Sequence, residues 1–296
     1  MSRIAMWMLV ACISTAVFAD EPVAEAEISA AQIAEKNVAA RGGLEPWRKI
    51  QSMVWIGYIE RAGAASLPYV LEQKRPNKTH FEIMAKNQVA TRIYDGTHGW
   101  KLHPASNGTP TLQPYTDEEL NFARDGQGID GELVDYQAKG IALTLDGVDE
   151  VEGRKAYRLS VQLPSGASHH LWIDAQTFLD VKYDRPSRNA LGHSSTVTVF
   201  YRNYQTIDGL QIPRLIESGV DTAKAMDKMV IDKISLNPPL EDRMFAKPNV
   251  PEGRNAVKVD ITHPQAVRQA VHSASVTPTG FSRLNPRSVH GSAVAR

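Results

Sequence analysis

The histidines offer the first candidate for chemistry, because they could ligate a metal ion or act as a general base. His169 and His170 are adjacent. On a strand, neighbouring side chains point to opposite faces, so this pair cannot chelate one metal in regular geometry. The sequence contains no H-E-x-x-H motif, and its other histidines are scattered, among them His80, His98, His103 and His193. We therefore predict exposed strand histidines and no metal site.

Nucleophilic and acid–base catalysis have little support in the residue pattern. The segment Gly166-Ala167-Ser168-His169-His170 lacks the second glycine of a G-x-S-x-G motif and falls in a predicted hairpin turn. Cys12, the one cysteine, lies in the N-terminal apolar segment. Acidic pairs at 117–118 and 149–150 fall at a predicted helix start and a predicted turn, where solvated acids are common. We expect no enzymatic activity, although a periplasmic hydrolase using acids or histidines stays an alternative.

The glycines at positions 126, 128 and 131 resemble a phosphate-binding loop only loosely. No strand precedes them and no long helix follows, as such a loop requires. They predict a connector, which could equally serve as a hinge. Neither a nucleotide nor any other cofactor is expected.

The elements that would position a binding site are strands. Residues 141–184 contain four runs in which apolar and polar residues alternate, with turn residues between them, which predicts an antiparallel meander with one buried face. The apolar positions are Ile141, Leu143 and Leu145; Tyr157, Leu159 and Val161; Leu171 and Ile173; and Leu179, Val181 and Tyr183.

The remainder of the folded region adds more strands and few helices. Ser29 and Gln32 form a capping box for a helix over 28–41, and Thr116 and Glu119 form another for a helix to about residue 124. A short helix over 45–50 and a helical turn over 132–137 are also expected. Further strands are predicted over 53–60, 68–75, 79–85, 89–94, 99–103, 194–204, 211–218 and 226–236, and Met244 and Phe245 should pack against the sheet.

These elements predict a mainly β (α+β) fold with about twelve strands. No alternation of strands and helices points to a parallel sheet. A sheet of this size should curl into an incomplete β-barrel, with helices as a lid over its concave face. The expected result is an apolar cavity under that lid.

The N-terminus has the pattern of a secretory signal peptide, with Arg3, an apolar segment over 4–18 and cleavage after Ala19. Leu9-Val10-Ala11-Cys12 also matches a bacterial lipobox, so a lipid anchor on Cys12 is an alternative. We predict a signal peptide over 1–19, a flexible segment over 20–27, a folded domain over 28–248 and a disordered basic tail over 249–296.

The chain has 33 basic and 33 acidic residues. This neutral balance argues against nucleic acid as a main partner. The last 46 residues carry six Lys or Arg against two acids. They could contact anionic lipid headgroups, so we expect peripheral membrane contact at most.

Several short motifs resemble those of outer-membrane lipoprotein-sorting proteins in the LolA/LolB-like superfamily of periplasmic lipoprotein carriers. They are Ala39-Ala40-Arg41-Gly42-Gly43, the segment 94–100 (YDGTHGW), the segment 153–159 (GRKAYRL), Leu171-Trp172-Ile173-Asp174, Phe178-Leu179-Asp180-Val181-Lys182, Tyr201-Arg202-Asn203-Tyr204 and Gly209-Leu210-Gln211-Ile212-Pro213. The resemblance covers about residues 29–248. It implies an unclosed antiparallel barrel that binds acyl chains in the periplasm of a Gram-negative cell.

We therefore predict a monomeric, non-catalytic periplasmic carrier or sensor for a lipid or for lipoprotein acyl chains. The alternative is an envelope protein-interaction or sensor module with a filled core. The expected lipid-binding residues are Ile56, Tyr69, Leu71, Phe81, Ile83, Ile93, Leu143, Tyr157, Leu159, Leu171, Ile173, Val181 and Val199. Because side chains alternate along a strand, a shift of one residue would move such a residue to the other face.

Overall fold

The computed structural model describes residues 28–85, 88–104, 110–126, 128–188, 194–220 and 225–249. The predicted signal peptide, the Cys12 lipobox and residues 250–296 of the predicted tail lie outside this part of the chain. Among the described helices, none has the length and apolar character needed to cross a bilayer.

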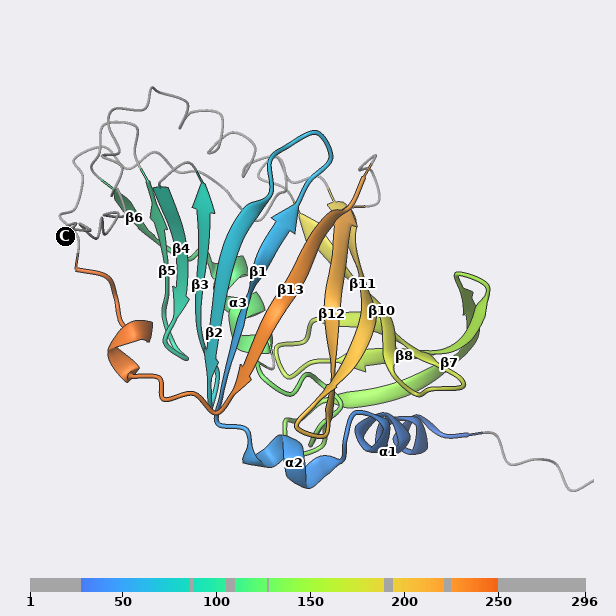
Figure 1. The fold of residues 1–296 in the computed structure, drawn as a ribbon. Helices are drawn as coiled ribbons and strands as arrows, with labels where there is room; N and C mark the ends of the chain where they lie inside the picture. Colours follow the sequence, from blue (N-terminus) through green and yellow to red (C-terminus); the bar gives the residue numbers. More distant parts are fainter. Residues whose placement is uncertain are drawn as a thin grey trace, which may run out of the picture.

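Among the described residues, one antiparallel sheet of thirteen strands dominates the fold (Figure 1). Its spatial order is β6-β5-β4-β3-β2-β1-β13-β12-β11-β10-β9-β8-β7, so β6 and β7 form two separate edges and the barrel is open. The strands are β1 (Ser52–Glu60), β2 (Leu67–Lys74), β3 (Lys78–Ala85), β4 (Gln88–Tyr94), β5 (Gly99–His103), β6 (Thr111–Pro114), β7 (Ala142–Val151), β8 (Arg154–Gln162), β9 (Ser168–Asp174), β10 (Asp180–Arg188), β11 (Ser194–Ile207), β12 (Leu210–Val220) and β13 (Asp227–Leu236).

In the described part of the chain, three α-helices and one 3₁₀ helix accompany the sheet: α1 (Ala30–Ala40), α2 (Leu44–Lys49), α3 (Asp117–Asp125) and η1 (Asp242–Phe245). Figure 1 shows α1 and α2 across the lower end of the sheet and α3 inside its curve. We call the side of the sheet that carries α1 and α3 the inner face. Because α3 lies on the link from edge strand β6 to edge strand β7, this link crosses the inner face.

Local signals explain why the helices begin and end where they do. Ser29 caps α1 and Thr116 caps α3, each through a complete capping box with the residue three positions later. Gly42 and Gly43 follow α1 with positive φ angles of 111° and 94°. A side chain at Gly42 would also collide with the backbone of the β11–β12 turn, because a Cβ there would lie 2.4 Å from the Gly209 carbonyl oxygen.

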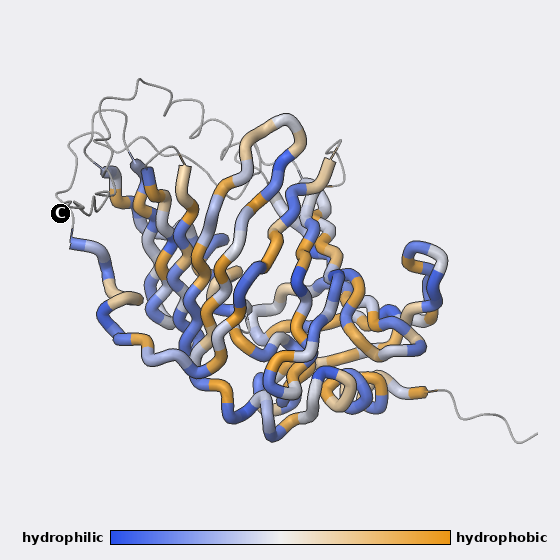
Figure 2. Tube along the Cα trace, in the orientation of Figure 1, coloured by the Kyte–Doolittle hydropathy of each residue, from blue (hydrophilic) through white to orange (hydrophobic). Residues whose placement is uncertain are grey.

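Apolar residues alternate with polar ones along the strands (Figure 2), and the inner positions form the core. Ile33 and Ala34 of α1 pack on Leu159 and Ile173, which are fully buried. A second cluster joins Trp47 of α2 to the strands at the middle of the sheet. A third lies on β1, β2, β3 and β13 around Tyr69, with partly buried neighbours. The inner face is thus filled at the β7–β9 end and more open toward β3.

The predicted open, curved sheet with helices on its concave face is confirmed. The sheet has one strand more than expected, since the sequence analysis did not predict β6. Residues 132–137 form turns rather than a helix in the structure. Phe245 is fully buried, as predicted for the segment that packs against the sheet.

Candidate functional site

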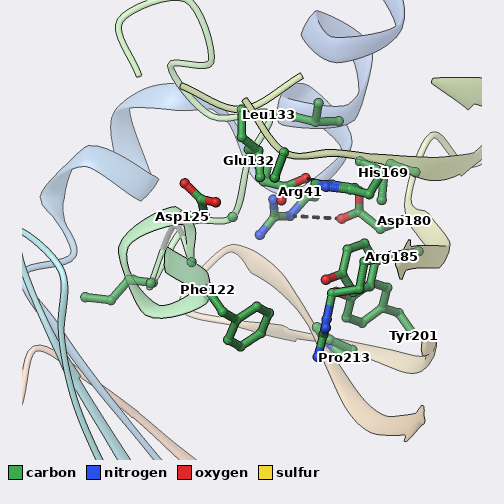
Figure 3. Close-up of a pocket in the computed structure, with 18 of the residues that line it drawn as sticks. Arg41, Phe122, Asp125, Glu132, Leu133, His169, Asp180, Arg185, Tyr201 and Pro213 are labelled. Carbon is green, nitrogen blue, oxygen red and sulfur yellow. Dashed lines mark hydrogen bonds and ion pairs between the residues drawn. The ribbon is translucent and has the colours of Figure 1, made fainter. Parts of the chain in front are cut away.

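A cavity of about 450 Å³ opens between the inner face and the segment that crosses it (Figure 3). Its walls come from α3, from the described residues of the connector that follows it (126 and 128–133), from strands β1, β9, β10, β11 and β12, from α2 and from the end of α1. Drug-sized ligands occupy pockets of roughly 300–1,000 Å³. The cavity is therefore large enough for a small apolar ligand or part of an acyl chain.

The apolar part of the lining comes from the sheet, from the connector and from α2 and α3, which contribute Trp47 and Phe122. Met53 and Trp55 contribute from β1, Leu171 from β9 and Ile212 from β12. Ile129 faces them from the connector. Such a lining favours apolar ligands, because each Å² of apolar surface removed from water contributes about 25 cal/mol.

One end of the cavity is polar and buried. The Nε atom of Arg41, the C-cap residue of α1, lies 3.7 Å from Oδ2 of Asp180, the first residue of β10 (Figure 3). Arg41 also donates from Nη1 to the Asp130 carbonyl oxygen at 2.9 Å. Its guanidinium stacks on the Trp47 ring with 4.6 Å to the centroid. The guanidinium is thus held from three directions.

Asp180 lies in surroundings that disfavour a charged carboxylate. Burial raises the pKa of its carboxyl above the ordinary value, although the positive charge of Arg41 opposes this shift. The Asn37 side-chain amide donates to Oδ1 at 3.3 Å. The Tyr204 hydroxyl donates to the Asp180 backbone carbonyl at 3.0 Å.

Tyrosines from β10 and β11 complete this polar end. Tyr183, Tyr201 and Tyr204 all line the cavity, and burial raises the pKa of each hydroxyl. Within the described residues, no hydrogen bond joins the Tyr201 hydroxyl to another group. This hydroxyl is a donor and an acceptor that a ligand could use.

A second polar pair lies beside the tyrosines. His169 Nε2 is 2.8 Å from Glu132 Oε2, and the imidazole meets the Tyr183 ring edge-on at 5.0 Å. His169 is buried in the cavity wall, in contrast to the exposed position predicted for it. His170 faces the opposite side, as predicted, where its Nδ1 lies 3.1 Å from Asp184.

The outer end of the cavity lies between α3 and β10. Phe122 of α3 is 52% exposed, and the Arg185 guanidinium lies over its ring at 4.4 Å to the centroid. Glu118 and Asn121 of the same helix also line the cavity. Figure 3 shows Phe122 and Arg185 on one side of the cavity and Arg41 with Asp180 on the other. We call this outer end of the cavity, where Arg185 lies over Phe122, the mouth.

Helix α3 is fixed at both ends. Glu119 is almost fully buried and accepts hydrogen bonds from Lys101 Nζ at 2.8 Å and Arg92 Nη2 at 3.0 Å. At the other end, Asn77 Nδ2 donates to the Ala123 carbonyl, and Ser165 Oγ to an Asp125 carboxylate oxygen. Phe122 therefore projects from a helix that hydrogen bonds hold at both ends.

Of the thirteen residues predicted to bind lipid, Leu171 lines the cavity. Four others belong to the core under α1: Leu143, Tyr157, Leu159 and Ile173. Another four belong to the cluster on β1–β3: Tyr69, Leu71, Phe81 and Ile83. Val199 pairs with Tyr183, which places it on the inner face.

The other three predicted residues lie on the outer face, so their face assignment is corrected. Ile56 is 40% exposed and is adjacent in β1 to the cavity-lining Trp55. Ile93 follows Arg92, whose guanidinium reaches α3 across the inner face. Val181 packs with outer-face residues, because a bulge between Asp180 and Lys182 interrupts the alternation along β10.

The polar residues of the cavity were not among the predicted site residues. Arg41, Asp180, Tyr201 and Tyr204 nevertheless stand in the motifs that carried the family resemblance. Those motifs come from distant parts of the chain, and the fold brings these four side chains together at one end of the cavity.

The described residues contain no group of three or more His, Cys, Asp or Glu side chains arranged to hold a metal ion. In the described region, Glu132 and His169 form a pair without the third member that a tetrahedral site would need.

Similar folds are found among solved structures. A LolA superfamily protein from Nitrosomonas europaea has 18% sequence identity and a TM-score of 0.48, over 74% of this chain and 98% of its own. A DUF1329 family protein from Desulfovibrio piger has 13% identity and a TM-score of 0.49, over 73% and 97%. A domain described as an outer membrane lipoprotein-sorting protein, from Vibrio parahaemolyticus, has 11% identity and a TM-score of 0.45, over 74% and 96%.

These similarities concern the fold. No family model matches the sequence, and no curated protein matches it either.

Proposed function

We propose that this protein is a non-catalytic periplasmic binding or carrier protein for a lipid or for lipoprotein acyl chains. The observation that carries the proposal is the cavity of about 450 Å³ between α3 and the inner face. A module with a filled core would leave no such space. Apolar side chains from α2, α3, the connector and strands β1, β9 and β12 converge on this cavity, as binding driven by apolar burial requires.

The arrangement of polar groups supports binding rather than catalysis. Ser168 is exposed and stands next to His169, whose imidazole is engaged by Glu132. Four carboxylates line the cavity, and the two at its polar end are paired, Asp180 with Arg41 and Glu132 with His169. The polar end therefore resembles a recognition surface for one end of an amphipathic ligand.

The test is the uptake of N-phenyl-1-naphthylamine, an uncharged probe whose fluorescence rises in apolar sites, followed by its displacement with acyl lipids. Pro213 lines the cavity from β12, so Pro213→Trp should fill the space with an indole ring. Pro213→Val is the matched control, because it keeps a small apolar side chain that suits a strand.

We expect saturable uptake by the wild-type protein and by Pro213→Val, and at least roughly tenfold weaker uptake by Pro213→Trp, a difference of about 1.4 kcal/mol in binding free energy. Native mass spectrometry of detergent-free protein should then show a bound acyl species. Equal uptake by all three proteins would place binding outside the cavity, and absence of uptake by the wild type would refute the proposal.

A further inference from the structure

The charges that line the cavity indicate which lipids it accepts. Four carboxylates and two guanidinium groups border it: Glu118, Asp125, Glu132 and Asp180 against Arg41 and Arg185. The cavity is therefore acidic, although the chain as a whole carries equal numbers of acidic and basic residues.

Each cation already has partners, although the buried Nε of Arg41 makes no hydrogen bond within the described residues. Arg41 is held by the Asp130 carbonyl, by Asp180 and by the Trp47 ring. Arg185 lies over the Phe122 ring at the mouth. An anionic head group at the polar end would face two carboxylates, Asp180 and Glu132, against the single guanidinium of Arg41. In this partly buried environment, like charges repel more strongly than in bulk water.

The same polar end offers suitable partners to an uncharged head group. Asp180 and Glu132 carry oxygen atoms that can accept hydrogen bonds from a ligand hydroxyl or amide. The Tyr201 hydroxyl lines the cavity and can donate to a ligand oxygen or accept from a ligand hydroxyl. A head group with both donors and acceptors would satisfy these groups without bringing a buried charge.

Resting on the proposed function, we propose that the cavity selects lipids with an uncharged head group that carries hydrogen-bond donors and rejects lipids with an anionic head group. The selecting cluster is Asp180, Glu132 and Tyr201, at the end of the cavity opposite the mouth. The acyl chain would then extend along the apolar walls toward Phe122.

The test compares two lipids that differ only in a phosphate: 1-palmitoylglycerol and 1-palmitoylglycerol 3-phosphate. The experiment measures how strongly each lipid displaces bound N-phenyl-1-naphthylamine from the full-length mature protein near neutral pH. Lipid concentrations stay below those at which the lipids aggregate. We expect the phosphate-bearing lipid to bind at least roughly tenfold more weakly to the wild-type protein.

Two isosteric variants assign the selectivity to this cluster. Glu132→Gln and Asp180→Asn each remove one negative charge, so each should reduce the difference between the two lipids by at least about threefold. Asp146→Asn is the matched control, because this carboxylate lies near His170 on the outer face and should leave the ratio unchanged.

The outcomes separate the two proposals. Equal binding of both lipids, or tighter binding of the phosphate-bearing lipid, overturns the selectivity and leaves the carrier function intact. A ratio that stays the same in Glu132→Gln and in Asp180→Asn overturns the role of the cluster. If neither the probe nor either lipid binds, the carrier function itself is refuted and the selectivity with it.

Discussion

Arg41 and Asp180 meet at the buried end of the cavity, with 3.7 Å between Nε and Oδ2. One ends the first helix and the other begins β10, so the ion pair joins elements that are far apart in sequence. Removing two charges from water costs several kcal/mol for each ion, which their attraction only partly offsets. A pair kept at such a cost beside a cavity is a candidate for function rather than for stability.

Asp180→Asn should change how stability depends on pH. Burial raises the pKa of Asp180 in the folded state despite the opposing charge of Arg41. The wild-type protein therefore loses stability as the pH rises above about 4 and through the folded pKa, whereas the variant has no carboxyl to ionise. The free energy of unfolding of the variant, relative to wild type, should thus increase with pH. Urea denaturation between about pH 4 and pH 7 measures this, and a constant difference would contradict it.

Glu119→Gln should destabilise the protein by roughly 3–5 kcal/mol near neutral pH, because it leaves the buried Lys101 ammonium without its carboxylate partner. Asp117→Asn is the control, since Asp117 is exposed in the same helix turn and should cost less than about 1 kcal/mol. Urea denaturation provides both values. Similar small losses in the two variants would show that α3 is not anchored through Glu119.

The Glu119 carboxylate also leads to a second, independent prediction for acid pH. Burial by itself raises the pKa of Glu119, but the hydrogen bond from Lys101, the Thr116 amide and the charge of Arg92 lower it below the ordinary value. Its stabilisation is therefore complete above the ordinary pKa of about 4.3 and is lost as the pH falls through the folded pKa. Glu119→Gln should show a shallower loss of stability on acidification than wild type. If the free energy of unfolding falls equally steeply with decreasing pH in both proteins, this assignment is refuted.

The local parts of the fold were predictable because their signals are local. Ser29 with Gln32 and Thr116 with Glu119 form the expected capping boxes, so both helix starts follow from four residues. Strand β6 escaped prediction because it has only four residues and ends in Pro114. So short a run has too few positions to show an alternating pattern.

The site was less predictable, since it depends on which face each residue occupies and on which strands meet. Both faces of β1 carry apolar residues, so alternation could not separate Ile56 from Trp55. The bulge beside Val181 reverses the faces within β10, and nothing in the local pattern marks it. Arg41 and Tyr201 converge only because the sheet curves, which no local motif specifies.

Leu159→Ala tests the inner face where α1 covers it. Leu159 is fully buried in the cluster that contains Ile33 and Ala34, so truncation should cost roughly 2–5 kcal/mol of unfolding free energy. Ile56→Ala is the matched control on the outer face, where 40% exposure predicts a loss below about 1 kcal/mol. Thermal and urea denaturation of both variants decide the question. A reversed order of the two losses would mean that the faces are misassigned.

Phe122→Ala tests the mouth. Phe122 is half exposed, so its loss should hardly affect stability, but it removes the ring over which Arg185 lies. A cation–π contact at an exposed site contributes roughly 0.5–1 kcal/mol, which corresponds to rates about two- to fivefold faster if the contact must open before a ligand enters. Stopped-flow measurements with N-phenyl-1-naphthylamine should show uptake and release accelerated by similar factors, with little change in affinity.

Phe122→Trp keeps an aromatic ring over which Arg185 can lie and should retain the slow rates. Unchanged kinetics in Phe122→Ala would show that ligands enter elsewhere, and a large loss of affinity alone would mean that Phe122 belongs to the binding wall.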